Sequence, residues 1–319
     1  MKNLLLTFII CVFISSNAFG WDDTGHKLTT YIAWQQMTPQ TREKVFEILM
    51  SAPEDSDLNV FYLQGSRSED AKRLELFMIA STWADIVRDR DFKARFKKYH
   101  HGTWHYLDNY WKEESGKIFA VDFEVAKENA VERLFAFDTL LRSDAKPNDE
   151  KAIALAWLLH IGGDIHQPLH CTSRVTETEK KGDQGGNLFL VSPKDAKEKV
   201  ALHWYWDSIV GRNIPRINDD CDSDYLPKIA NKITKKHNLA KMSDSLKLGK
   251  YDEWQKEGYE FAIKEVYQNG LVRNEMPTDK YKKRAFVISQ ERIALAGYRL
   301  GQTLNDMFGK TIESPMKPK

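Results

Sequence analysis

Apolar residues recur at helical spacing along most of the chain beyond residue 20. Thr38 followed by Pro39 is typical of an N-cap and a first helical turn, and the apolar residues that follow fall on one stripe. Residues 149–164 are apolar almost all round, which predicts a buried central helix that Pro168 prevents from continuing far. The same periodicity predicts helices over residues 68–88, 122–141, 199–209, 252–268 and 279–308.

Two short stretches interrupt the helical pattern. Residues 103–108 and 187–191 have extended character, and the second stretch follows three turn-forming glycines. No repeat period and no linker rich in Pro, Gly or Ser divides the chain. We therefore predict one all-α domain of many helices, with at most a short β-hairpin, over residues 21–319.

The first twenty residues have the features of a cleavable export signal. A basic residue near the start precedes an apolar run, and small residues stand at the end of the segment. The run is shorter than a membrane-spanning helix requires, and bulky residues precede Cys11, so a retained anchor or a lipoprotein is less favoured. We predict cleavage after Gly20, Trp21 as the mature N-terminus, and a secreted or periplasmic protein without a stable membrane anchor.

The composition is that of a globular protein with a large core. Of 319 residues, 42% are apolar and 12% aromatic, and 47 basic residues nearly balance 46 acidic ones. The balance excludes the broad basic excess by which many proteins bind nucleic acid. Binding of a polyanion would therefore depend on local geometry or on bound cations.

Two cysteines, Cys171 and Cys221, remain after removal of the signal. An extracytoplasmic compartment permits a disulfide, which would close a loop of 50 residues and contribute about 4 kcal/mol in the chain-entropy model. Two reduced buried thiols are an equal alternative, because the sequence does not place the two α-carbons close together.

Two pairs of metal-ligand residue types repeat the same spacing. His160 and Asp164 stand four residues apart on the predicted central helix, and His203 and Asp207 stand four apart on a later one. Residues at i and i+4 share a helical face, so each pair can present an imidazole and a carboxylate to one divalent cation. One such pair usually makes a surface hydrogen bond. Two pairs within apolar sequence indicate a metal site, because a buried aspartate is costly without a cation.

Three further residues extend this candidate site. His170 lies beyond the helix-breaking proline, where a loop can fold it back, and Asp85 and His105 each lie close to a tryptophan in the sequence. Taken alone, each is more simply interpreted as a buried polar group with hydrogen-bond partners, but their combination favours a metal cluster. The histidines that we exclude from the cluster are His100, His101, His166 and His237.

Together these residues resemble the zinc-dependent S1/P1 nuclease family. The helices expected in the C-terminal third fit the mostly α-helical fold of that family without being diagnostic. The motifs that carry the resemblance occur in the same order along residues 21–207: Trp21, Gly25-His26, Trp83-Ala84-Asp85, Trp104-His105-Tyr106, His160-x3-Asp164-x5-His170 and His203-x3-Asp207.

The resemblance implies a cluster of three zinc ions. The ligands of the first would be Asp85, His105, His160 and Asp164. The ligands of the second would be His170, His203 and Asp207. The ligands of the third would be the α-amino group and carbonyl oxygen of Trp21, together with His26 and the other oxygen of Asp164.

The resemblance also assigns residues to the substrate. Asp85 would orient the attacking water, and Arg88 would bind a phosphate oxygen, with an ion pair to a neighbouring aspartate as an equal alternative. Tyr106 and Asp108 would stack on a base and hydrogen-bond its edge, with a core tyrosine and a turn aspartate as the alternative. Asn187 would contact phosphate or serve as a plain turn residue.

The implied function is that of an exported nuclease. It would hydrolyse single-stranded DNA and RNA to 5′-phosphate products. Single strands are favoured because only an unpaired base can be placed on a stacking side chain. An additional 3′-nucleotidase activity is a further option. The alternatives are a zinc-dependent phospholipase C, which typically has Glu where this chain has Asp207, and a zinc-binding protein without turnover. The sequence indicates no protein partner.

Overall fold

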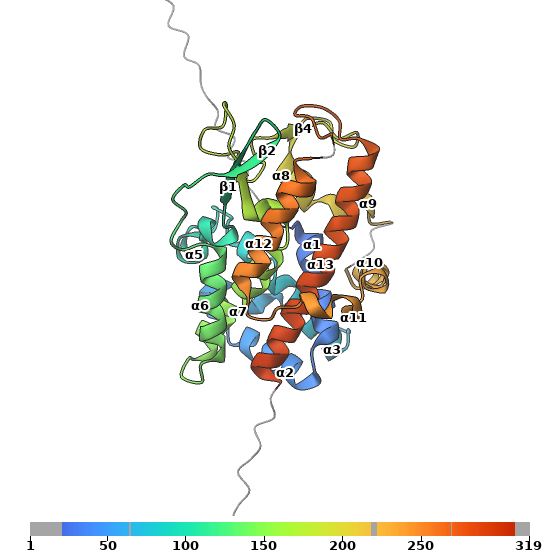
Figure 1. The fold of residues 1–319 in the computed structure, drawn as a ribbon. Helices are drawn as coiled ribbons and strands as arrows, with labels where there is room; N and C mark the ends of the chain where they lie inside the picture. Colours follow the sequence, from blue (N-terminus) through green and yellow to red (C-terminus); the bar gives the residue numbers. More distant parts are fainter. Residues whose placement is uncertain (1–20, 64, 218–221, 269, 310–319) are drawn as a thin grey trace, which may run out of the picture.

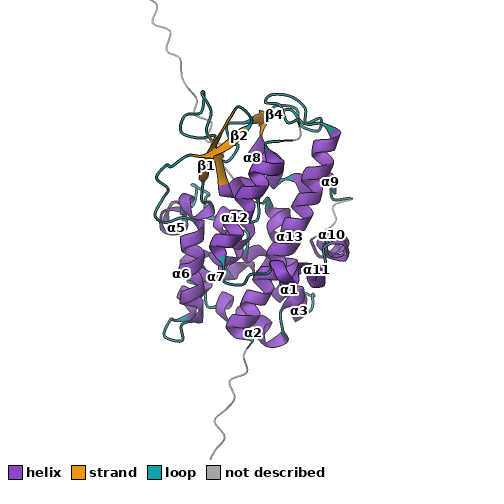
Figure 2. Cartoon of the chain, in the orientation of Figure 1, coloured by secondary structure: helices purple, strands orange, loops and turns teal. Residues whose placement is uncertain are grey.

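The computed structural model describes residues 21–63, 65–217, 222–268 and 270–309. Helices dominate, and the few strands gather at one end of the molecule (Figures 1 and 2), which confirms the predicted all-α class with minor β structure. The helices are α1 (Asp23–Gln36), α2 (Pro39–Met50), α3 (Glu69–Ala80), α4 (Trp83–Ile86), α5 (Lys93–Tyr99), α6 (Ala130–Arg142), α7 (Asn148–Asp164), α8 (Leu202–Asp207), α9 (Ile209–Asn213), α10 (Asp222–Lys236), α11 (Leu239–Met242), α12 (Tyr251–Phe261) and α13 (Asp279–Phe308).

Helix α7 is the centre of the fold, as its uniformly apolar sequence predicts. Every residue from 154 to 164 is buried. Helices α2, α6 and α13 pack against α7, and α13 also packs along α1 (Figure 1). The last turn of α7, which carries His160 and Asp164, therefore lies in the interior, where an unpaired carboxylate would be costly.

The predicted starts of two long helices are confirmed. The hydroxyl of Thr38 accepts a hydrogen bond from the backbone N–H of Thr41, and Pro39 is the first residue of α2. Thr278 caps α13 in the same way by accepting from the N–H of Tyr281. These caps satisfy N–H groups that the first helical turn leaves without partners.

The predicted helix over residues 68–88 is interrupted between α3 and α4. At the junction, the hydroxyl groups of Ser81 and Thr82 donate to carbonyl oxygens three residues earlier. Such side-chain bonds compete with the helical ladder. The carbonyl oxygen of Ser81 accepts a hydrogen bond from His160 Nδ1 at 2.7 Å, so the break links α3 to the candidate metal site.

Other predicted helices have different bounds. Helix α6 begins at Ala130 rather than near residue 122, because the Asn129 side chain accepts from two N–H groups of the first turn. Residues 199–209 contain a short strand before α8, and α12 gives way to a π-helical turn, Ala262–Val266. Helices α1, α5, α10 and α11 lie outside the predicted helical ranges.

The structure contains more sheet than the single predicted hairpin. β1 pairs antiparallel with β2 and parallel with β3, and β4 pairs antiparallel with β5. The stretch 103–108 is not extended throughout, because Gly102–His105 forms a 3₁₀ turn. The parallel pair brings the segment after His105 beside the segment after His170. The strands are β1 (Asn109–Glu114), β2 (Lys117–Ala120), β3 (Thr172–Arg174), β4 (Leu190–Val191) and β5 (Val200–Ala201).

Two predictions concern residues that the structure does not describe. The expected signal peptide, residues 1–20, and Cys221 lie outside the described ranges. Cys171 is fully buried and bonds to no other cysteine among the described residues, and its Sγ lies 3.3 Å from the carbonyl oxygen of Ile165. Within the described ranges, no helix combines the length and the apolar character needed to cross a membrane.

Candidate metal centre

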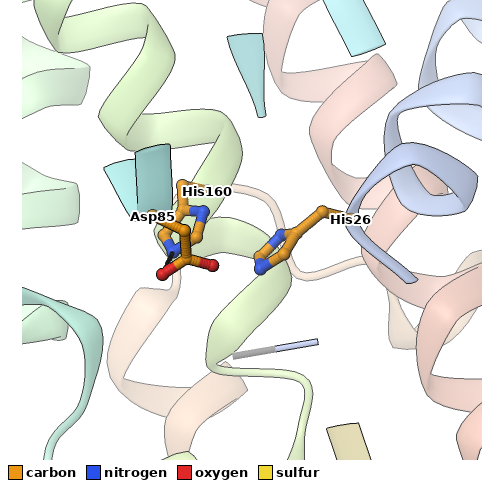
Figure 3. Close-up of side chains that lie close together, drawn as sticks. All are labelled: His26, Asp85 and His160. Carbon is orange, nitrogen blue, oxygen red and sulfur yellow. Dashed lines mark ion pairs between the residues drawn. The ribbon is translucent and has the colours of Figure 1, made fainter. Parts of the chain in front are cut away.

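Eight His and Asp side chains converge at the end of α7, all of them residues that the sequence proposed as ligands. Figure 3 shows one part of this centre, where His26 on α1 approaches Asp85 and His160 from the opposite side. The side chains form three groups whose ligand atoms lie within 4.8 Å of one another: His26, Asp85 and His160; His105, His160 and Asp164; His170, His203 and Asp207.

Asp164 lies at the centre of these groups and is fully buried. Its Oδ2 lies 3.2 Å from both His105 Nδ1 and His160 Nε2. Its Oδ1 lies 3.2 Å from His26 Nε2. Because its two oxygens face different imidazoles, this carboxylate can contact two cations at once.

The third group lies beyond Asp164, between the loop after α7 and helix α8. His170 Nε2 and His203 Nε2 are 3.0 Å apart, and His203 Nε2 lies 3.7 Å from Asp207 Oδ2. The other oxygen of Asp207 accepts a hydrogen bond of 2.7 Å from the side-chain amide of Gln167. Gln167 could not be predicted as part of the centre, because nothing in its spacing distinguishes it from other polar loop residues.

Backbone carbonyl groups orient three of the imidazoles. In each case Nδ1 donates a hydrogen bond of 2.7 Å, which fixes the tautomer in which Nε2 carries the lone pair that can bind a metal ion. The three donor and acceptor pairs are His160 with Ser81, His170 with His105, and His203 with Gly185.

Several buried polar atoms in the centre have no hydrogen-bond partner among the described residues. Each such atom costs on the order of 1–3 kcal/mol when it stays unpaired. Imidazoles combined with carboxylates form a donor set that suits zinc. The centre therefore fits divalent cations. The atoms without a hydrogen bond are Asp207 Oδ2, His105 Nε2, His26 Nδ1, and the facing pair Asp164 Oδ1 and His26 Nε2, which lie 3.2 Å apart.

Burial and neighbouring charges shift the pKa values of these groups in opposite directions. Burial lowers the pKa of His105 to about 4. Burial also acts to lower the pKa of His160, but the charges of Asp164 and Asp85 outweigh it and raise that pKa to about 9. Burial, together with the charge of Asp164, raises the pKa of Asp207 well above its usual range. A bound cation would favour the ionised form of Asp207.

Trp21 is fully buried beside this centre. The backbone N–H of the next residue, Asp22, donates to the carbonyl oxygen of Asp207 at 3.2 Å. A methyl group on Gly163 would lie 2.9 Å from His26 Nδ1 and 3.8 Å from Trp21 Cδ1. The absence of a side chain at this position of α7 therefore allows both residues to lie against the helix.

A cleft of about 610 Å³ opens beside three of the imidazoles, those of His105, His170 and His203. Besides Asp85, the sequence assigned four residues to the substrate, and all four line this cleft. They are Arg88, Tyr106, Asp108 and Asn187.

Two of these residues also make the contacts named as alternatives. Arg88 Nη1 forms an ion pair with Asp85 Oδ1 at 2.9 Å. The side-chain amide of Asn187 donates to the carbonyl oxygen of Gln184 at 2.8 Å, as in a plain turn. Tyr106 is 38% exposed at the cleft, so it is not a core tyrosine.

The four excluded histidines lie outside the three ligand groups. His166 is buried, but its Nδ1 donates to the carbonyl oxygen of Gly162 and its Nε2 accepts from Arg299. His100 stacks on Phe96, and His101 stacks on a tryptophan. Hydrogen bonds and ring contacts therefore account for three of these histidines without a metal ion.

Known proteins resemble this chain over nearly its whole length. It is 25% identical to Endonuclease 2 of Arabidopsis thaliana over 324 aligned residues, which cover 96% of this chain and 97% of the relative. It is 24% identical to Nuclease S1 of Aspergillus oryzae, with 96% and 98% of the two chains covered. The family model described as S1/P1 Nuclease matches residues 21–309. The predicted resemblance is confirmed, and the chain belongs to the S1/P1 nuclease family.

Proposed function

We propose that this protein is an exported, zinc-dependent nuclease that hydrolyses single-stranded DNA and RNA to products with 5′-phosphates, with 3′-nucleotidase activity as a further capacity. One observation carries the proposal: eight His and Asp side chains converge beside a cleft, in a chain of the nuclease family. The centre provides ligands for cations, and the cleft provides room for a nucleotide.

We assign three zinc ions to the centre. The assignment of His26 to the third ion is supported by the 3.2 Å between His26 Nε2 and Asp164 Oδ1. Zinc, when bound, supplies an activated water near neutral pH and positive charge for the phosphoryl group. The proposed ligand sets are Asp85, His105, His160 and Asp164 for the first ion, His170, His203 and Asp207 for the second, and Trp21, His26 and Asp164 for the third.

The remaining roles belong to Asp85 in the metal centre and to side chains that line the cleft. We assign Asp85 to orient the attacking water through its carboxylate. Arg88 donates to a non-bridging phosphate oxygen. Its ion pair with Asp85 already holds the guanidinium group near the centre. Asn187 donates its amide to a second phosphate oxygen. Each of these roles places a donor or acceptor where charge develops on the phosphoryl group.

The preference for single strands follows from the base platform. Tyr106 lies at the cleft beside His105. A base that belongs to a duplex would have to lose its pairing and its stacking before it could stack on this ring. Asp108, which lines the same cleft, can then hydrogen-bond the exposed edge of that base. An unpaired strand presents such a base without the cost of opening a helix.

The test uses mature protein that begins at Trp21 and is loaded with zinc. We expect about three zinc ions per chain and cleavage of single-stranded DNA and RNA, with much slower cleavage of duplex DNA. The exposed Asp144→Ala variant is the matched control for Asp164→Ala, which should lose activity. Hydrolysis of lecithin without cleavage of denatured DNA would instead identify a phospholipase, and bound zinc without any turnover would identify a binding protein.

A further inference from the structure

The side chain of Gln255, on helix α12, connects two segments of the candidate site that are far apart in the chain. Gln255 is 4% exposed. Its Nε2 donates to the carbonyl oxygen of Leu107 at 2.9 Å and to that of Cys171 at 3.1 Å. Its Oε1 accepts a hydrogen bond of 3.1 Å from the side-chain amide of Asn109. Both N–H groups and the oxygen of this buried amide are therefore engaged.

The two carbonyl groups belong to segments that carry proposed functional residues. Cys171 directly follows the proposed zinc ligand His170, and Leu107 directly follows Tyr106, the proposed base platform. The backbone N–H of Leu107 also donates to the carbonyl oxygen of His170 at 3.0 Å, and the parallel pairing of β1 with β3 begins just beyond these residues. Gln255 therefore ties the segment of the base platform to the segment of a metal ligand where the two meet.

Helix α12 lies closely against the same turn. Gly258 follows Gln255 by three residues and lies on the same face of the helix. A methyl group on Gly258 would collide with Cys171 Sγ and would lie 3.1 Å from the carbonyl oxygen of Ile165. The glycine therefore allows the close approach by which the Gln255 amide reaches both segments.

Gln255 acts on the substrate only through these segments. It does not line the cleft, and it belongs to none of the three ligand groups. A base that stacks on Tyr106 brings its phosphate to the metal centre only while the two segments keep their relative position. Misplacement of reacting groups by about 1 Å can lower a rate by about 100-fold.

We propose that Gln255 is a positioning residue that sets the distance between the base platform, Tyr106, and the metal centre. The inference rests on the proposed nuclease function. It assigns to α12, in the C-terminal part of the chain, a direct part in aligning the substrate.

The first experiment measures kcat and KM of Gln255→Met, which keeps an unbranched side chain but removes both donors and the acceptor. We expect kcat for a single-stranded oligonucleotide to fall by about 10- to 100-fold, with KM changed by less than about threefold, because the base still stacks while its phosphate is misplaced. Bis(p-nitrophenyl) phosphate carries no base, so its hydrolysis should stay within about twofold of the wild-type rate at equal zinc content.

A double variant tests whether Gln255 acts through the platform. In the Tyr106→Ala background, Gln255→Met should cause little further loss of kcat/KM on the oligonucleotide, because no platform remains to be positioned. Tyr298→Phe is the matched control, since Tyr298 is 2% exposed and also donates to a backbone carbonyl group, that of His237, but does not line the cleft. Equal losses on both substrates, or additive losses in the double variant, would overturn the inference.

A milder variant tests the same idea if Gln255→Met does not fold. Asn109→Ala removes the amide that orients the Gln255 oxygen and leaves both bonds to the carbonyl groups possible. The same difference between the two substrates should appear, with kcat for the oligonucleotide lowered by about 3- to 10-fold. A folded Asn109→Ala protein without this difference would refute the positioning role.

Amide hydrogen exchange, followed by mass spectrometry, tests the link between the segments without an activity assay. Peptides that cover residues 105–112 and 168–175 should exchange about tenfold faster in Gln255→Met than in the wild type, and Tyr298→Phe should not change them. Unchanged exchange would overturn the inference whatever the activity. If the wild-type protein cleaves no single-stranded DNA, the proposed function fails, and faster exchange in both segments would still show that Gln255 fixes their relative position.

Discussion

Tyr106→Ala separates substrate binding from chemistry at the cleft. The tyrosine ring is 38% exposed and lines the cleft, and its backbone carbonyl, which accepts from the N–H of Ala130, is retained in the variant. A base stacked on an aromatic ring contributes about 1–3 kcal/mol. Loss of the ring should therefore raise KM for a single-stranded oligonucleotide by about 5- to 150-fold, with a smaller effect on kcat.

The assay compares that oligonucleotide with a small phosphodiester that carries no base, such as bis(p-nitrophenyl) phosphate. The small substrate should be cleaved almost as by the wild type, because it cannot use the platform. Phe119→Ala is the matched control, since Phe119 is also a partly exposed aromatic but does not line the cleft. Equal losses on both substrates, with reduced zinc content, would show that Tyr106 supports the metal centre instead of the base.

Three further substitutions test the centre itself. Asp164→Ala should weaken two zinc sites together and cost more activity than loss of any other single ligand. Full zinc content with near-normal turnover in this variant would refute the bridging role. Gln167→Leu removes the amide that donates to Asp207, so zinc affinity measured by competition with a chelator should fall by about 10- to 100-fold. Gly163→Ala places a methyl group 2.9 Å from His26 Nδ1, so about one zinc ion should be lost. Circular dichroism should show that the variant stays folded. Unchanged zinc content would mean that His26 can move without loss of the ion.

The proposed ligands could be selected from the sequence because chemistry and periodicity coincide in them. His160 and Asp164 stand on one face of a helix that is apolar on every other side, and this contrast marks them as functional. Backbone carbonyl groups, one of them at the break between α3 and α4, then orient the imidazoles. Gln167 has no such signal, because it acts through a hydrogen bond to Asp207, which lies 40 residues further along the chain.

The misplaced start of α6 has a related physical cause. Val125 and Ala126 fit a helical stripe in the sequence, which led to the predicted helix over residues 122–141. In the structure they line the cleft, and Val125 is 39% exposed. An apolar side chain at a binding cleft and one in the core have the same hydrophobicity, so periodicity alone does not distinguish them.

Maturation offers the last prediction, because the proposed third zinc site uses the α-amino group of Trp21. In the precursor this nitrogen belongs to a peptide bond, whose delocalised lone pair makes it a poor metal ligand. Trp21 is buried, and Asp22 is tied to the backbone of Asp207, so an added residue cannot simply replace it with its own amino group. A single glycine before Trp21 should therefore remove one ion and leave the two sites built from side chains.

The experiment compares protein that begins at Trp21 with protein that carries this extra glycine, and with a longer extension that a protease removes at Trp21. We expect about two zinc ions and very slow hydrolysis of single-stranded DNA for both extended forms, because the third ion would supply positive charge that stabilises the leaving oxygen. Cleavage of the longer extension should restore the third ion and the activity together. Three ions and full activity in the glycine-extended protein would show that the amino group is not a ligand, and that removal of the signal does not switch on the enzyme.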